Sequence, residues 1–258
     1  MMGAETEDKL LNTIARTFFA EFFGTAIFVL IVSLSYTPSE HRAAIYPFLS
    51  GIALLVAQTC FFDVSGAHYN PVITVSRFVH GKLPGYAVVS YIIAQLFGSF
   101  LGAVLFRSLL SQNVFVDSYL PNTIIYYDKD QKLSRLQAFL LEAICTAILC
   151  LVRHGSDGDD EETYSDNYMA TPIAWASVTA ICLPLIGQAN NMALIFGQSI
   201  VFYVFTSQER HLNFLYLNAL SGLVALFIAS TVIATQRKPR ENSEILPSTS
   251  VHGESMRT

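Results

Sequence analysis

The chain has 258 residues, of which 52% are hydrophobic and only 14% are charged. In soluble domains roughly a quarter of the residues are charged, so this composition excludes an ordinary soluble domain. The mean hydropathy of +0.44 indicates a membrane protein. The formal net charge of -5 also excludes the basic surface that binds nucleic acid.

Six stretches are long and apolar enough to cross a bilayer, which takes about 20 residues of helix. In chain order they are residues 17–36, 43–62, 85–106, 136–152, 170–185 and 214–234. Two shorter apolar stretches, 70–79 and 192–205, follow the second and fifth spans and predict re-entrant half-helices. The sequence therefore predicts an all-α membrane protein with six transmembrane helices and two re-entrant half-helices.

The termini of the chain are expected on one side of the membrane, because the number of crossings is even. The polar N-terminus and the length of the first apolar stretch argue against a cleaved signal peptide, so we expect this span to be retained. The side that holds the termini carries 9 Lys and Arg against 6 on the other. The positive-inside rule then predicts that both termini are cytosolic.

The loop between the fourth and fifth spans is acidic, with six Asp and Glu in residues 154–168. A divalent-cation site is one interpretation, but the loop lacks the ligand order of an EF-hand, and a solvated charge run is favoured. The four cysteines all lie in apolar stretches, which is typical of small core residues. We therefore predict no metal site and no cofactor.

The two halves of the sequence match at an offset of 121 residues. This offset aligns Glu21 with Glu142, the only Asp, Glu, Lys or Arg within the predicted spans, and Asn70 with Asn191. Composition bias does not explain such matches, so the halves are predicted to be structural repeats. Each half has three crossings, an odd number, so the repeats are inverted, an arrangement that places a solute site at the interface of the halves near mid-membrane.

Each predicted half-helix begins at one of the aligned asparagines. A helix N-terminus presents unpaired N–H groups and partial positive charge, so two such ends at mid-membrane favour a neutral hydrogen-bonding solute and oppose cations. Asn70 and Asn191 are also suited to capping ordinary loops. The repeat favours the interpretation that they line a pore.

The two intramembrane acids also have two interpretations. Groups of this kind often belong to proton or ion pathways. Re-entrant loops, however, leave backbone N–H groups that must be bonded inside the protein. We favour the second role, in which Glu21 and Glu142 anchor the two loops by accepting such bonds.

Three sequence motifs resemble the aquaporin (major intrinsic protein) family. They are AEFFGT at 20–25, SGAHYNPV at 65–72 and YIIAQLFG at 91–98. The resemblance extends to about residue 234, although the family's second signature, NPARSFGPA, is degraded here to NMALIFGQS at 191–199. It implies a channel for water, and sometimes glycerol or other small uncharged solutes, that excludes protons.

The family's selectivity filter maps by ungapped counting onto Ser50, Thr179, Gln188 and Leu194. A single gap would move the span-five position from Thr179 to Val178 or Ala180. Leu194 stands where the family carries an arginine, and Ser50 and Thr179 are small where water-selective members carry larger rings. The resemblance thus implies a wider, less polar and uncharged filter. Ile195 stands where glycerol-conducting members tend to carry an acidic residue, so that subclass is not supported.

Three functions remain open from the sequence. The leading hypothesis is a passive channel for water or small uncharged solutes, and the second is a poorly conducting relative with an adhesion, junctional or regulatory role. A gated ion channel ranks last, and no motif indicates an enzyme.

The expected organisation is a cytosolic segment at 1–16, a channel domain at 17–234 with repeats at about 17–113 and 136–234, and a disordered cytosolic tail at 235–258. The family resemblance implies a homotetramer. The plasma membrane is favoured over an internal membrane.

Overall fold

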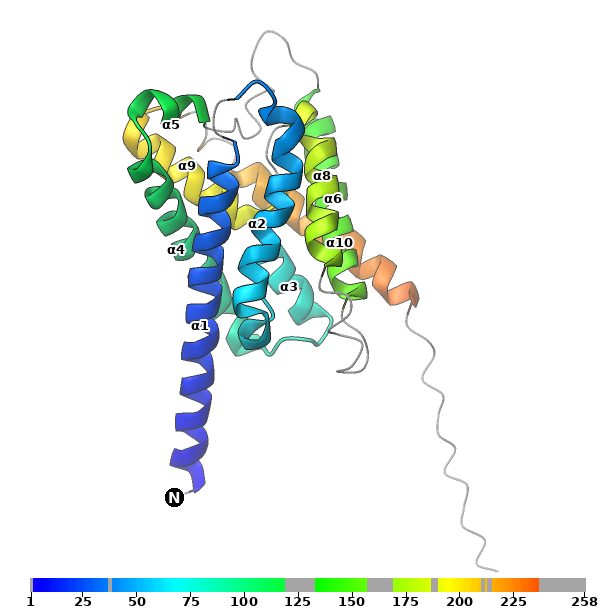
Figure 1. Ribbon diagram of the computed structural model, residues 1–258. Helices are drawn as coiled ribbons and strands as arrows, with labels where there is room; N and C mark the ends of the chain where they lie inside the picture. The colour runs from blue at the N-terminus through cyan, green and yellow to red at the C-terminus, as the bar shows by residue number, and fades with distance from the viewer. Residues whose placement is uncertain are drawn as a thin grey trace, which may run out of the picture.

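The computed structural model describes residues 2–36, 39–118, 133–156, 169–186, 190–209, 212 and 215–236. These residues form a bundle of helices (Figure 1). The helices are α1 (Met2–Leu34), α2 (Arg42–Ser65), α3 (Pro71–Val79), α4 (Gly85–Leu109), α5 (Gln112–Ser118), α6 (Arg135–Gly155), α8 (Ala170–Ile186), α9 (Met192–Thr206) and α10 (Leu215–Gln236).

Five helices in the described part of the chain are long and apolar enough to span a membrane, namely α1, α2, α4, α6 and α10. The sixth predicted span is α8, whose 17 residues extend about 25 Å. The predicted half-helices are the short helices α3 and α9, and α5 is an additional helix that the sequence did not indicate. The all-helical membrane fold is therefore confirmed.

The first helix begins earlier than expected. Residues 2–16, predicted as a segment separate from the first span, continue it without a break as the first turns of α1. The stretch from Ala4 to Arg16 contains no proline or glycine and is rich in Ala, Glu, Leu, Lys and Arg, which favour helix. Nothing in its sequence therefore stops α1 from extending beyond the apolar stretch.

The two halves of the bundle repeat each other. Helices α1 and α6 end at Leu34 and Gly155, α2 and α8 end at Ser65 and Ile186, and each pair of ends differs by 121 residues. Helices α3 and α9 start at the same offset. The packing repeats too, because α1 contacts α2 and α4 as α6 contacts α8 and α10. In Figure 1, α3 lies toward the end of the bundle where α1 begins and α9 toward the opposite end, as inverted repeats require.

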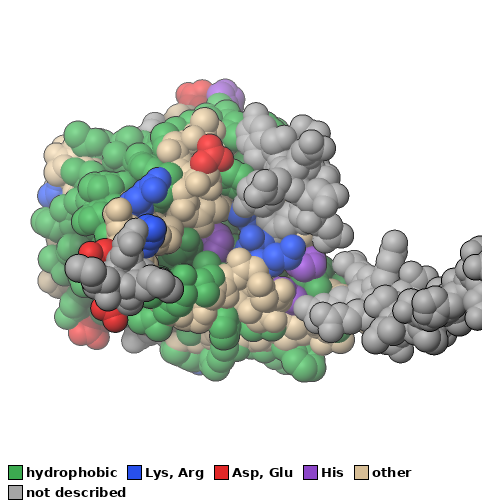
Figure 2. Space-filling model, turned by 90° about the horizontal axis from the view of Figure 1, so that it is seen from below, with side chains coloured by type: hydrophobic (Ala, Val, Ile, Leu, Met, Phe, Trp, Pro, Cys, Tyr) green, Lys and Arg blue, Asp and Glu red, His purple; other side chains and the backbone are tan. Residues whose placement is uncertain are grey.

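The polarity of the bundle suits a bilayer. Large apolar side chains such as Phe48, Phe97 and Phe227 point outward, at 71%, 62% and 74% exposure. Polar side chains such as Glu21, Gln95 and Asn191 are buried. Figure 2 shows hydrophobic side chains around the edge of one face and several Lys, Arg and His side chains nearer its middle. The chain is an integral multi-pass membrane protein.

Helices α1 and α4 cross closely because α4 carries glycines at the contact. A Cβ atom added at Gly98 would meet the backbone oxygen of Phe22, and one added at Gly102 would meet that of Ala26. Small residues at such positions let helix backbones approach in a membrane, where van der Waals packing drives association.

We predict that Gly98→Ala lowers the stability of the protein by about 1–3 kcal/mol, because the added methyl group overpacks a contact with backbone that does not yield. Thermal unfolding of purified protein in detergent measures the effect. Gly155→Ala is the matched control, since a Cβ there meets no atom within 4 Å. Equal unfolding midpoints for the two variants would contradict the close crossing.

Candidate functional site

The two half-helices start at capped ends. The Asn70 side-chain oxygen accepts a hydrogen bond from the Val72 N–H at 3.0 Å. The Asn191 side-chain oxygen accepts from the N–H groups of Ala193 and Leu194 at 3.0 and 3.2 Å. Both asparagines have extended backbone, the usual conformation of an N-cap. Each asparagine thus fixes the first turn of its half-helix.

The capped ends are also bonded to each other. Asn70 Nδ2 donates to the carbonyl of Asn190, and Asn191 Nδ2 donates to the carbonyl of Tyr69, both at 2.9 Å. The two bonds are related by the offset of the repeat. They bring the positive ends of α3 and α9 together, and each amide nitrogen carries a second hydrogen that can be donated elsewhere.

The residue before each asparagine has a left-handed backbone, with φ of 50° at Tyr69 and 72° at Asn190. Such conformations are uncommon for residues other than glycine and persist where the surrounding structure holds them. The two strained residues occupy equivalent positions in the repeat. The approach of the half-helices thus depends on contacts that hold these turns.

Glu21 provides those contacts in the first half. One carboxylate oxygen accepts from the Ser65 hydroxyl at 2.6 Å and the His68 N–H at 3.0 Å. The other accepts from the Tyr69 N–H at 3.0 Å and the Gln95 amide at 2.8 Å. The side chain is fully buried, so one buried carboxylate accepts all four bonds, and only the Gln95 amide has a second acceptor, the Thr74 hydroxyl.

Glu142 lies at the equivalent place in the second half. The Asn218 amide of α10 donates to its carboxylate, and Asn190 contributes a backbone hydrogen bond to it. The latter corresponds to the bond from Tyr69 to Glu21 in the first half. Residues 187–189 of the second loop lie outside the described residues.

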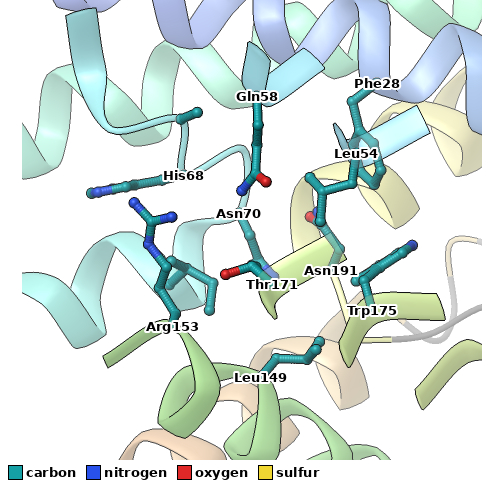
Figure 3. Close-up of a pocket in the computed structure, with 12 residues that line it drawn as sticks. Phe28, Leu54, Gln58, His68, Asn70, Leu149, Arg153, Thr171, Trp175 and Asn191 are labelled. Carbon is teal, nitrogen blue, oxygen red and sulfur yellow. The ribbon is translucent and has the colours of Figure 1, made fainter. Parts of the chain in front are cut away.

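A narrow pocket opens beside the paired asparagines (Figure 3). Its volume of about 20 Å³ compares with the roughly 10–15 Å³ that a cavity needs to hold a water molecule. The pocket therefore has room for about one water at a time. The residues that line it are Phe28, Leu54, Gln58, Ala67, His68, Asn70, Ile73, Leu149, Arg153, Thr171, Trp175 and Asn191.

Polar atoms on the pocket wall lack protein partners. Gln58 Oε1, Thr171 Oγ1 and Trp175 Nε1 are buried, and among the described residues none of them has a hydrogen-bond partner. Buried polar groups are normally satisfied by protein or ordered water. The amide oxygen accepts hydrogen bonds, the hydroxyl donates and accepts them, and the indole nitrogen donates one. This combination suits a small hydrogen-bonding solute.

Arg153, one of the nine Lys and Arg assigned to the side of the termini, was not expected in the pocket but lines it. It lies inside α6 and is 3% exposed. Arg153 Nη2 donates to the Gly66 carbonyl, and the guanidinium lies over the Phe62 ring, 5.3 Å from its centroid. The sequence could have indicated this position. Arg153 lies 11 residues after Glu142, about 20° more than three helical turns, so the two side chains lie on the same face of α6.

The predicted filter residues occupy other places. Ser50 and Leu194 are fully buried and Thr179 nearly so, and none of these three described residues lines the pocket. The Ser50 hydroxyl donates to the Pro47 carbonyl at 2.8 Å. Gln188 lies outside the described residues. The assignment of these positions to a filter stays a prediction.

The acidic loop also stays untested, since its residues 157–168 lie outside the described residues. Among the residues that the structure describes, no group of three or more His, Cys, Asp or Glu is placed to hold a metal ion.

The chain matches a known protein family over most of its length. The Major intrinsic protein family matches residues 10–242. "Glycerol uptake facilitator protein-like 6" of Lactiplantibacillus plantarum is 23% identical over 185 residues, which cover 72% of this chain and 83% of that protein. The glycerol uptake facilitator protein of Pseudomonas aeruginosa is 26% identical over 205 residues, covering 72% and 73%.

A solved structure shares the fold. The aquaglyceroporin from Plasmodium falciparum matches with a TM-score of 0.66 at 20% sequence identity, over 86% of this chain and 94% of that one. The overall arrangement of the helices is therefore a known architecture.

Proposed function

The chain belongs to the major intrinsic protein family, and from this premise we propose that it is a passive channel whose pore runs between Asn70 and Asn191. Proteins of this family pass water or small solutes through a membrane and are transporters rather than enzymes. One observation carries the proposal. Two helix N-termini are bonded to each other beside a pocket with room for about one water.

The proposed solutes are water and small uncharged molecules. The wall offers hydrogen bonds through the asparagine amides, Gln58, Thr171 and Trp175, while the helix ends disfavour cations. Likeness to two glycerol uptake facilitators supports including glycerol among the solutes tested, although Ile195 stands where an acid is expected in glycerol-conducting members. Anchoring of the loops by Glu21 and Glu142 is part of this proposal.

For the orientation and the assembly, the proposal keeps the expectations from the sequence. We propose that both termini are cytosolic, because the side that holds them carries more Lys and Arg. A homotetramer is proposed from the family alone, and the plasma membrane stays favoured over an internal membrane.

Stopped-flow light scattering on proteoliposomes tests the function. We expect an osmotic step to shrink vesicles with the protein several-fold faster than empty vesicles. We expect Leu194→Arg to reduce glycerol and urea permeability relative to water, because a cation at the filter narrows the pore and adds donors. Leu194→Met is the matched control, since it keeps an apolar side chain at the same place.

Shrinkage no faster than that of empty vesicles, with no entry of glycerol, urea or peroxide, would refute the channel. That outcome would favour a non-conducting relative, and tight binding between vesicles would then indicate an adhesion role. An unchanged solute-to-water ratio in Leu194→Arg would remove Leu194 from the filter without affecting the channel.

A further inference from the structure

Two aromatic side chains, Phe28 of α1 and Trp175 of α8, contact each other on the wall of the pocket that Asn191 also lines. We propose that this pair is the specificity-determining constriction of the channel, which limits solutes by their width. The proposal rests on the channel function and deepens it, because it names the class of solute that the pore favours: water and solutes of similar width over broader molecules such as glycerol.

The two rings are held in a defined arrangement. Their centroids lie 5.5 Å apart and their planes are 76° from parallel, the edge-to-face geometry that aromatic pairs favour. Phe28 is fully buried and Trp175 is 3% exposed. Neighbouring side chains therefore leave little room for either ring to turn away from the pocket.

The contact joins helices from the two halves of the repeat. Helix α1 packs on α2 and α4, whereas α8 packs on α2 and α6. Helix α2 therefore lies between α1 and α8 (Figure 1). Phe28 and Trp175 thus meet across the space that these helices enclose, and their contact narrows it.

The repeat shows where this wall is asymmetric. The offset of 121 residues relates Phe28 to Leu149. The same offset relates Leu54 to Trp175, and all four side chains line the pocket. Each pair thus has one leucine and one aromatic residue, and the two aromatic rings are in contact. Replacing either ring by leucine therefore gives its position the residue of the equivalent position.

The space beside the rings is narrow. In Figure 3 Phe28 and Trp175 lie together at one end of the pocket, on the side of Asn191. The pocket volume of about 20 Å³ leaves room for about one water. Thr179, the expected filter residue of α8, lies one turn further along the helix and does not line the pocket. Pore diameter is a main source of selectivity in such channels, so the rings limit width where the small predicted filter residues do not.

Trp175 also brings a polar atom to the constriction. Its Nε1 atom is buried and has no hydrogen-bond partner among the described residues. A buried N–H is normally bonded to protein or to ordered water, and the indole nitrogen can only donate. The side chain therefore narrows the pore and still offers a hydrogen bond to a passing water.

A purely packing role is the competing explanation, because a large side chain removed from a buried place leaves a cavity and lowers stability. The ratio of glycerol to water permeability separates the roles. Loss of folded protein lowers both permeabilities together, whereas a wider pore raises glycerol relative to water. Phe106→Leu is the matched control for Phe28→Leu, since Phe106 is 3% exposed, contacts the Phe115 ring and does not line the pocket.

The test measures water and glycerol permeability by stopped-flow light scattering on vesicles that contain the full-length protein. Trp175→Leu and Phe28→Leu should each raise the glycerol-to-water ratio by roughly tenfold, which corresponds to a barrier about 1.4 kcal/mol lower. Trp175→Phe, which keeps a ring, should raise the ratio less than Trp175→Leu. Phe106→Leu should keep the low ratio of the wild type.

Folded leucine variants with the ratio of the wild type would overturn the proposal and leave the two rings as packing residues. If neither variant folds, the wild type decides. Glycerol entry through the protein as fast as that of urea, a narrower molecule, would overturn the constriction, and slower glycerol entry would support it. Wild-type vesicles that shrink no faster than empty ones would instead refute the channel function, so the two failures are distinguishable.

Discussion

Replacing Glu21 with alanine should prevent the protein from accumulating in a folded, water-conducting form. The carboxylate accepts hydrogen bonds from Ser65, His68, Tyr69 and Gln95. Its removal leaves three buried donors without their acceptor and the Gln95 amide with the Thr74 hydroxyl alone. Each such loss costs about 1–3 kcal/mol, so the variant should lose about 4 kcal/mol or more of stability. Expression, size-exclusion profile and unfolding midpoint in detergent measure this loss.

Two comparisons isolate the cause. Glu21→Gln keeps the shape of the side chain and one acceptor oxygen, so it should be less damaging than the alanine variant. Glu142→Ala, at the equivalent position of the second half, removes the acceptor for the Asn218 amide and tests whether the second loop depends on its acid to the same extent. A folded Glu21→Ala protein with normal water permeability would contradict the role of Glu21 as the anchor of the first loop.

The repeat was the part of the fold that the sequence predicted best. Matched rare residues, the two acids and the two asparagines, located both half-helices, and α3 and α9 begin at the residues that follow those asparagines. Long apolar stretches predicted the spans because a bilayer sets their length. The early start of α1 and the short helix α5 were missed, because neither depends on burial in the membrane.

The pocket was harder to predict than the fold. Asn70 and Asn191 were expected at the pore and line the pocket, whereas Arg153 and Trp175 were not singled out. Hydropathy windows stop where charge begins, so an arginine at the end of a span is counted as a loop residue. Helical phase relative to Glu142 would have indicated that Arg153 points inward. The partners of a residue across helices, such as Gly66 for Arg153, require the three-dimensional structure.

A bulky side chain at Thr171 should block the pore. Thr171 lies at the start of α8, is 8% exposed and lines the pocket with Asn70 and Asn191. An indole is much larger than a pocket with room for about one water, so Thr171→Trp should close it. Ser177→Trp is the matched control, because Ser177 lies on the same helix and is exposed on its outer surface. Both variants are first checked for a single size-exclusion peak.

The most direct test of the channel is the rate of osmotic shrinkage of vesicles that contain equal amounts of wild type, Thr171→Trp or Ser177→Trp. The pore between Asn70 and Asn191 predicts rapid shrinkage with wild type and Ser177→Trp, and shrinkage at the rate of empty vesicles with Thr171→Trp. Equal, rapid shrinkage with all three folded proteins would show that water does not pass through this pocket and would contradict the proposed pore.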